Sequence, residues 1–198
     1  MSKPEFPTGL LEVLRGLMAW FEEGGIRGVV IGGVAASLLG RPRVTRDVDA
    51  LVLVEEGQWG SFLAGGAQFG FLPRRPDALR FARKSRVLLA RHQATGIDVD
   101  IVLGALPLEQ ETVSRAQAVK VSGVAVSVPT PEDLIIMKAF ANRPRDVADI
   151  ESLLDSHPRV DLRRVRRWVG ELAATVEMPE ILENFESILA KWRIQKKG

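Results

Sequence analysis

The chain of 198 residues contains no cysteine, no tyrosine and only two histidines, His92 and His157. Without cysteine there is no disulfide framework, no cysteine-ligated metal site and no thiol nucleophile. Two histidines this far apart also cannot form the HExxH motif of a zinc protease. These absences exclude thiol catalysis and the common zinc sites.

Long hydrophobic runs are missing as well. No stretch approaches the roughly 18 apolar residues that a membrane span needs. The first residues, Met1 to Thr8, contain two prolines and lack the apolar core of a signal peptide. The formal net charge of +2 permits a nucleic-acid partner but does not require one. We therefore expect a globular, cytoplasmic protein with no membrane partner.

The hydrophobic patterns predict an α+β fold in two lobes. Up to residue 129, helical patterns alternate with short apolar runs typical of strands. Helices are predicted at 9–23, 34–39, 58–69 and 106–118, and strands at 29–31, 48–54, 86–91, 97–103 and 124–128. From the Thr130 cap onward only helical patterns follow, with breaks near Pro144, Pro158 and Pro179. Residues 1–129 are thus expected to form a mixed-sheet lobe flanked by helices, and residues 130–198 an all-helical lobe.

Two aspartates, Asp47 and Asp49, stand at the head of an apolar run from Ala50 to Val54. Alternate residues of a strand share a face, so both carboxylates should point to the same side. Two like charges that enter a core are costly unless something neutralises them. A divalent cation is the simplest candidate, and carboxylate oxygens suit magnesium. The alternative is a pair of solvated aspartates at the mouth of the strand.

A second pair, Asp98 and Asp100, precedes the apolar run from Ile101 to Leu103. Carboxylates from two strands, brought together, would form the acidic cluster that two-metal phosphoryl or nucleotidyl transfer requires. The alternative is a half-exposed strand with a polar outer side, and we expect at least one of the two aspartates to have that role.

The dipeptide Gly32-Gly33 separates a predicted strand from a predicted helix. Glycines here would let a phosphate approach the backbone, and the helix N-terminus offers amide hydrogens. No Gly-Lys-Ser/Thr follows and no GxGxxG occurs, so this is neither a Walker loop nor a Rossmann fingerprint. The alternative is a simple tight turn.

Taken together, these motifs resemble the polymerase-β-type nucleotidyltransferase superfamily. They are most similar to the minimal nucleotidyltransferases of the AbiEii/AbiGii toxin type. In those proteins a Gly-Gly pair and a small-residue helix precede an Arg or Lys with Thr just before Asp-x-Asp. Here the order is Gly32-Gly33, Ala35-Ala36-Ser37, and Arg43 to Asp49. Segments 131–138 and 143–149 resemble the same family, so the likeness spans residues 29–154.

The resemblance implies a catalytic set of Asp47, Asp49 and a third carboxylate, which together would hold Mg²⁺ or Mn²⁺. Both Asp98 and Asp100 fit the third position. We favour Asp100 because the apolar run follows it directly, and Asp98 is the alternative.

The resemblance also places the phosphates of a nucleoside triphosphate at Gly32, Gly33, Ser37 and Lys138. The residues alone favour another interpretation of Lys138, namely a lysine at the edge of a core stripe whose charged end snorkels to solvent.

Asp146 and Asp149 share a helix face, and their role in the family is open. A salt bridge between Arg145 and Asp149 is the structural alternative.

The implied reaction moves a nucleoside monophosphate from a nucleoside triphosphate to an acceptor hydroxyl and releases pyrophosphate. The toxin type suggests a tRNA end as acceptor and an antitoxin as a possible partner. An arginine-rich run from Arg74 to Arg91 would suit RNA or the triphosphate, or would be a solvated face. Two alternatives stay open: a non-catalytic nucleotide- or RNA-binding module, and a small-molecule, antibiotic-type nucleotidyltransferase.

Overall fold

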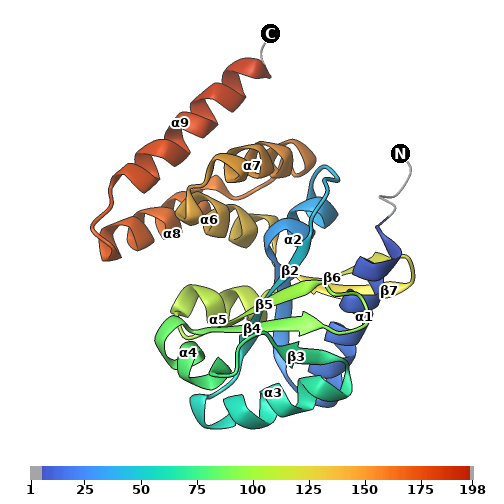
Figure 1. Cartoon of the computed structure of the whole chain (residues 1–198). Helices are drawn as coiled ribbons and strands as arrows, with labels where there is room; N and C mark the ends of the chain where they lie inside the picture. The colour runs from blue at the N-terminus through green and yellow to red at the C-terminus, as the bar shows by residue number, and fades with distance from the viewer. Residues whose placement is uncertain (1–5, 197–198) are drawn as a thin grey trace. The chain divides into compact units, whose positions relative to one another are not determined.

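Helices and strands form two compact units in the computed structural model, which describes residues 6–196 (Figure 1). The first unit contains the chain up to Ala35 and then Arg43–Pro129. The second contains Ala36–Pro42 and the chain from Thr130 onward. The junction after Pro129 was expected from the sequence, whereas the grouping of residues 36–42 with the helical unit was not. The expectation about a signal peptide falls largely on residues outside the described range.

Within residues 6–196, the first unit is built on a five-stranded mixed sheet in the order β1-β2-β5-β4-β3. The strands are β1 (Arg27–Ile31), β2 (Asp47–Leu53), β3 (Phe71–Pro73), β4 (Val87–His92) and β5 (Asp98–Leu103). β2 and β5 pair in parallel, and the other neighbours are antiparallel. This confirms the mixed α+β class and the predicted hairpin between β4 and β5.

Helices of the first unit bury apolar stripes against this sheet. They are α1 (Thr8–Glu23), α3 (Trp59–Gln68), α4 (Ala78–Ser85) and α5 (Pro107–Ser114), with a 3₁₀ turn at Glu56–Gln58. In α1 the predicted spacing of three and four buries Leu10, Leu14 and Leu17, and Gly24 ends the helix. β3 and α4 were not predicted, because the most evident feature of their stretch is its run of charge.

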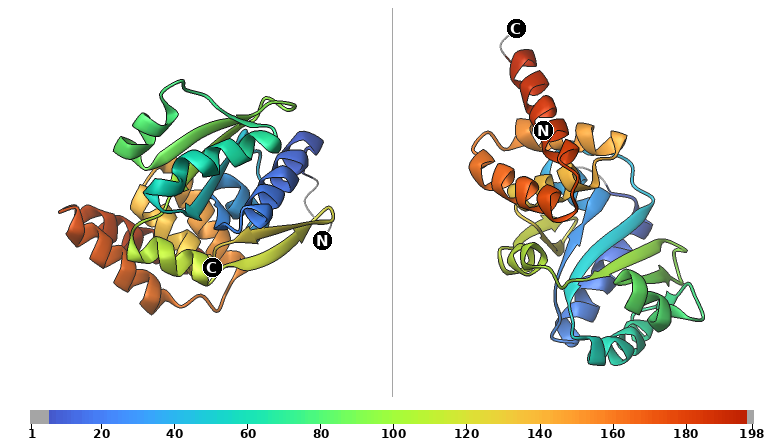
Figure 2. Two further views of the ribbon diagram at one scale, coloured as in Figure 1. Left: turned by 90° about the horizontal axis from the view of Figure 1, so that it is seen from below. Right: turned by 90° about the vertical axis from the view of Figure 1, so that its left-hand side faces the viewer.

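The predicted helix 106–118 is too long, because α5 ends at Ser114. Its expected last residues, Gln117 and Ala118, instead begin strand β6 (Gln117–Val121). β6 pairs with β7 (Val124–Val128) across Ser122 and Gly123, which both have positive φ as in a type I′ hairpin. The hairpin is yellow-green to yellow in Figure 2, beside α1, and the Ser127 amide donates to Met18 Sδ at 3.5 Å.

The second unit is helical, as predicted. In the described part of the chain it comprises α6 (Pro131–Ala141), α7 (Pro144–Ser156), α8 (Leu162–Thr175) and α9 (Glu180–Gln195). Thr130 caps α6, since its Oγ1 accepts from the Asp133 amide at 3.2 Å. No helix within residues 6–196 is both long enough and apolar enough to cross a membrane.

Residues 36–42 join this helical unit through polar contacts to α7. They include the end of α2 (Gly32–Leu39), the helix that begins in the first unit. The Arg41 amide donates to Ser152 Oγ at 2.5 Å, and the Arg41 guanidinium pairs with Asp155 at 2.6 Å. His157 Nε2 lies 2.6 Å from the Leu39 carbonyl oxygen. These contacts join residues far apart in sequence, which is why no local pattern predicted them.

Two glycines of α3 provide a test of the packing around Trp20. A Cβ at Gly66 would lie 2.6 Å from the Trp20 ring, which is buried and stacked on Phe62 at 4.4 Å. A Cβ at Gly60 would meet only a Leu79 methyl, at an ordinary 3.8 Å. We expect Gly66→Ala to lower the free energy of unfolding by about 1–3 kcal/mol through overpacking. Gly60→Ala should raise it by up to about 1 kcal/mol. Denaturant unfolding measures both, and equal effects would contradict this packing.

Candidate functional site

Four aspartates lie side by side at the start of two adjacent parallel strands. The register places Asp47 of β2 opposite Asp98 of β5, and Asp49 opposite Asp100. Along both strands the residue between the aspartates is buried, whereas the aspartates themselves are exposed or half-buried. Each pair therefore shares one face of its strand, as the two-residue period predicts. The structure thus brings together all the carboxylates that the sequence singled out as metal ligands.

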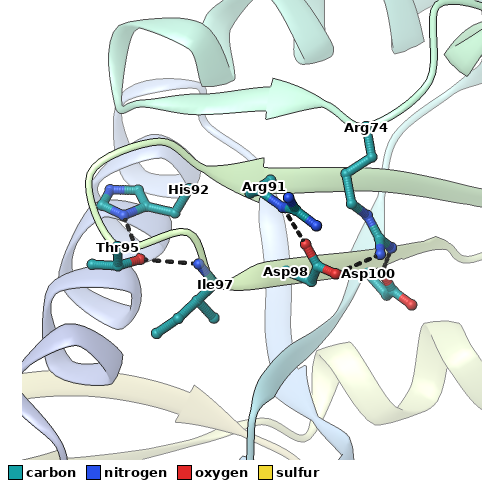
Figure 3. Close-up of polar contacts among 7 residues, drawn as sticks. All are labelled: Arg74, Arg91, His92, Thr95, Ile97, Asp98 and Asp100. Carbon is teal, nitrogen blue, oxygen red and sulfur yellow. Dashed lines mark hydrogen bonds and ion pairs between the residues drawn. The ribbon is translucent and has the colours of Figure 1, made fainter.

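Two arginines from outside these strands contact the aspartates of β5 (Figure 3). Arg74 donates from Nη1 to Asp98 Oδ2 at 2.8 Å and from Nη2 to Asp100 Oδ1. Arg91, opposite Asp98 on β4, donates from Nε to Asp98 Oδ1 at 2.6 Å. In the sequence both arginines stand out only as members of a basic run. Their partners depend on the order of the strands, which no local signal reveals.

The two carboxylates of β5 differ in their electrostatics. The hydrogen bond from Arg91, with the charge of Arg74, lowers the pKa of Asp98 against the opposing effect of burial. Burial raises the pKa of Asp100, and the charges of Asp47 and Asp98 raise it further, against the favourable charge of Arg74. Asp98 thus has two guanidinium partners, whereas Asp100 has Arg74 as its guanidinium partner and is also affected by the charge of Asp47 on the neighbouring strand.

Gly32, the first residue of α2, packs directly against Asp49. Its φ is +64°, and a Cβ there would lie 2.7 Å from Asp49 Cγ. At Gly33 a Cβ would lie 2.8 Å from Thr45 Cγ2 and 3.0 Å from Arg43 Nη2. Both glycines are therefore required by close approach of the chain itself. The same packing brings a carboxylate of β2 and the Arg43 guanidinium to the first turn of α2.

The remaining predicted phosphate ligands, Ser37 and Lys138, are both buried, each at 3% exposed or less. Lys138 Nζ pairs with Asp146 Oδ1 at 2.9 Å and with Asp149 Oδ2 at 2.7 Å. Lys138 is therefore no snorkelling lysine, and it pairs with both aspartates of the helix face that the sequence singled out. A contact between Lys138 and a triphosphate stays a prediction, and it would require the ammonium group to leave these carboxylates.

The donor atoms of Asp47, Asp49 and Asp100 suit Mg²⁺ or Mn²⁺, because both ions prefer carboxylate oxygens. As the side chains stand, however, no three acidic or histidine residues among 6–196 converge into a group that could hold a metal. Asp100 is engaged by Arg74, and Asp49 also has a partner of its own. The chemistry of the donor set therefore fits a divalent cation, whereas binding would require side chains to move.

A cavity of about 1030 Å³ lies at the other end of the same strands, bordered by Leu53, Arg86 and Gly104. The Arg86 side chain forms part of it and donates to the carbonyl oxygens of Leu103 and Gly104, at 2.8 and 3.2 Å. The paired carboxylates of β2 and β5 stand at the opposite ends of these strands. We therefore take the aspartate end of β2 and β5 as the candidate site.

Comparison with known proteins gives both a family and a fold. A sequence model of the family described as "Nucleotidyltransferase of unknown function (DUF6036)" matches residues 21–197. No curated protein sequence matches the chain.

Solved structures of similar fold include an antigenic nucleotidyltransferase-like protein from Paracoccidioides brasiliensis, with 14% identity and a TM-score of 0.53 over 89% of this chain and 93% of that one. The antibiotic-resistance factor ANT(2'')-Ia has 14% identity and a TM-score of 0.59, over 92% and 99%. The lincosamide antibiotic adenylyltransferase LnuA has 12% identity and a TM-score of 0.50, over 75% and 96%. At such low identity these likenesses show the fold alone.

The contact between Gly32 and Asp49 can be tested with a matched glycine. Gly25 has a similar φ of +61°, but a Cβ there would meet nothing within 4 Å. Both Gly25→Ala and Gly32→Ala should incur the backbone cost of a left-handed conformation, about 1–2 kcal/mol. We expect Gly32→Ala to cost more in the free energy of unfolding, because it also displaces Asp49. Equal costs in thermal or denaturant unfolding would contradict the close packing.

The buried cluster around Lys138 predicts a pH-dependent stability. Lys138→Met would leave Asp146 and Asp149 buried without their shared ammonium partner, which should cost about 3–5 kcal/mol near neutral pH. Burial would raise the pKa of Asp146, but hydrogen bonds from Arg143 and Lys138 outweigh it and lower that pKa.

A carboxyl group with a lowered pKa stabilises the fold fully above its ordinary pKa, and this stability is lost as the pH falls through the lowered value. The difference between wild type and Lys138→Met should therefore shrink in acid. Urea unfolding near neutral pH and at a pH below the ordinary carboxyl pKa of 3.8 measures this. Lys84→Met, at an exposed lysine, is the control. A difference independent of pH would contradict the buried ion pairs.

Proposed function

Because this chain belongs to the nucleotidyltransferase family DUF6036, we propose that it is an enzyme that transfers a nucleoside monophosphate. The donor is a nucleoside triphosphate, the acceptor is a hydroxyl group, and pyrophosphate is released. The observation that carries the proposal is the register of β2 with β5, which places Asp47 and Asp49 beside Asp98 and Asp100. Nucleotidyl transfer with divalent cations uses carboxylates that lie close together, as they do at the start of these two neighbouring strands.

In this proposal Asp47, Asp49 and Asp100 form the catalytic set. Asp100 is preferred to Asp98 because Asp98 is held by two arginines, Arg91 and Arg74, whereas Arg74 is the arginine that holds Asp100. When bound to these residues, Mg²⁺ or Mn²⁺ would neutralise phosphate charge and lower the pKa of the acceptor hydroxyl. The fold contributes the fixed positions of these residues on two paired strands.

The triphosphate is proposed to lie at the first turn of α2, along Gly32 and Gly33. The amide hydrogens of a helix N-terminus attract phosphate, and the nearby Arg43 guanidinium adds a charged donor of the kind that binds phosphate well. Ser37 and Lys138 stay predicted ligands, and both would need to become accessible.

Two acceptor classes are proposed, each with its own support. The resemblance to toxin-type enzymes favours an RNA acceptor such as a tRNA end, and it also suggests an antitoxin partner. Exposed arginines of α4, Arg80 and Arg83, would add positive charge for a polyanion. Similarity of fold to ANT(2'')-Ia, whose crystal structure includes adenylyl-2''-tobramycin, and to the lincosamide antibiotic adenylyltransferase LnuA favours a small-molecule acceptor.

Transfer of label from α-labelled ATP, CTP, GTP and UTP tests the reaction directly. With Mg²⁺ present, total RNA, total protein and aminoglycosides are offered as acceptors. We expect label on one class, and Asp47→Asn/Asp49→Asn should reduce it at least about 10²-fold, as expected for losing preorganised electrostatic groups. Asp77→Asn, at the start of α4, is the control and should retain activity. Binding of a triphosphate without turnover on any acceptor would support the non-catalytic binding module instead.

A further inference from the structure

The guanidinium of Arg74 holds both carboxylates of β5 at once. It donates to Asp98 at 2.8 Å and also to Asp100, and its side chain is only 23% exposed. The inner nitrogen, Nε, is buried and has no hydrogen-bond partner among residues 6–196. Within that range, the hydrogen bonds of the guanidinium therefore go to these two aspartates.

Backbone pairing fixes the position from which Arg74 reaches β5. Arg74 follows Pro73, the last residue of edge strand β3. Its amide donates to the Leu89 carbonyl oxygen of β4 at 2.9 Å, which continues the pairing beyond the proline. The side chain then extends over β4 to β5 (Figure 3). In the turn between β4 and β5, Thr95 Oγ1 accepts a hydrogen bond from the Ile97 amide at 3.3 Å. This bond holds the turn that leads into Asp98.

We propose that Arg74 is a positioning residue that serves as the resident counter-ion of Asp98 and Asp100, and that it must release Asp100 before this carboxylate can bind a divalent cation with Asp47 and Asp49. The inference rests on the proposed function. A guanidinium and a metal ion both need the negative charge of Asp100, and two cations at one carboxylate repel each other. Metal binding at Asp100 would therefore have to displace the contact that Arg74 makes there.

Arg91 provides a comparison that separates the bond to Asp100 from the general effect of a nearby positive charge. It is also an arginine on Asp98, at 2.6 Å, but it makes no bond to Asp100 among the contacts of the described residues. With Arg91 in place, Asp98 keeps a counter-ion after Arg74 moves. Metal binding would therefore leave Asp100, but not Asp98, without a guanidinium partner.

The opposite role for Arg74 makes a different prediction. A group that hydrogen-bonds a metal-binding carboxylate often orients it, and loss of such a group weakens metal binding. If Arg74 orients Asp100 in this way, its removal should lower metal affinity. If Arg74 competes for Asp100, its removal should raise the affinity. The sign of the change therefore decides between the two.

Binding of Mn²⁺ to the full chain, followed by the electron paramagnetic resonance signal of the free ion, tests the proposal. We expect Arg74→Gln to bind Mn²⁺ at least about fivefold more tightly than wild type, the lower end of typical coupling between sites. Arg74→Lys, which keeps the positive charge but replaces the two forked Nη donors by one ammonium group, should show a smaller gain. Arg91→Gln should show none. The gain should disappear in Arg74→Gln/Asp100→Asn.

Equal or weaker binding by Arg74→Gln would overturn the proposal, and so would an equal gain in Arg91→Gln. Circular dichroism establishes that each variant is folded. If Arg74→Gln does not fold, Arg74→Lys decides, and the absence of any gain overturns the proposal. Label transfer by the wild type separates the role of Arg74 from the proposed nucleotidyl transfer. Transfer that depends on Asp47 and Asp49, without a gain in Arg74→Gln, would refute only the role of Arg74. A gain without transfer would refute only the proposed reaction.

Discussion

The parallel pairing of β2 with β5 is the constraint on which the rest of the first unit depends. It places two pairs of aspartates side by side at the start of the central strands, where like charges repel and partial burial adds a further cost. Parallel neighbours require a long crossover connection. Here the crossover contains α3, β3, α4 and β4. It also supplies the two cations, Arg74 and Arg91, that neutralise the β5 aspartates.

A second constraint acts at the start of α2. Gly32 adopts a left-handed conformation against Asp49, and Gly33 lies against the segment that carries Arg43 and Thr45. The Gly-Gly pair thus lets a helix N-terminus, a carboxylate and a guanidinium pack within one small volume. α2 begins at these glycines and continues to Leu39, and its last residues belong to the helical unit. The candidate site is therefore linked to the helical unit by a single continuous helix.

In the helical unit, Lys138 has a structural role that the sequence did not predict. The resemblance to toxin-type enzymes implies a phosphate ligand at Lys138, yet in the structure its ammonium group balances two buried aspartates. A buried ion pair contributes little net stability relative to apolar packing, although breaking it is costly. Asp146 and Asp149, which share a helix face, provide the geometry that makes Lys138 tolerable inside this unit.

The features that depend on local period and local chemistry could be predicted from the residues of single segments, whereas the contacts between segments came from the fold. The two-residue period placed each aspartate pair on one strand face, the spacing of leucines predicted α1, and Thr130 with Pro131 marked the start of the helical unit. The order of the motifs along the chain was enough to indicate the nucleotidyltransferase superfamily.

A period says which face a side chain occupies, but not which strand lies next to it. The register of Asp49 with Asp100, the reach of Arg74 across β4 and the burial of Lys138 between aspartates all depend on contacts between distant segments. The same is true of β6, which forms a strand because β7 is there to pair with it.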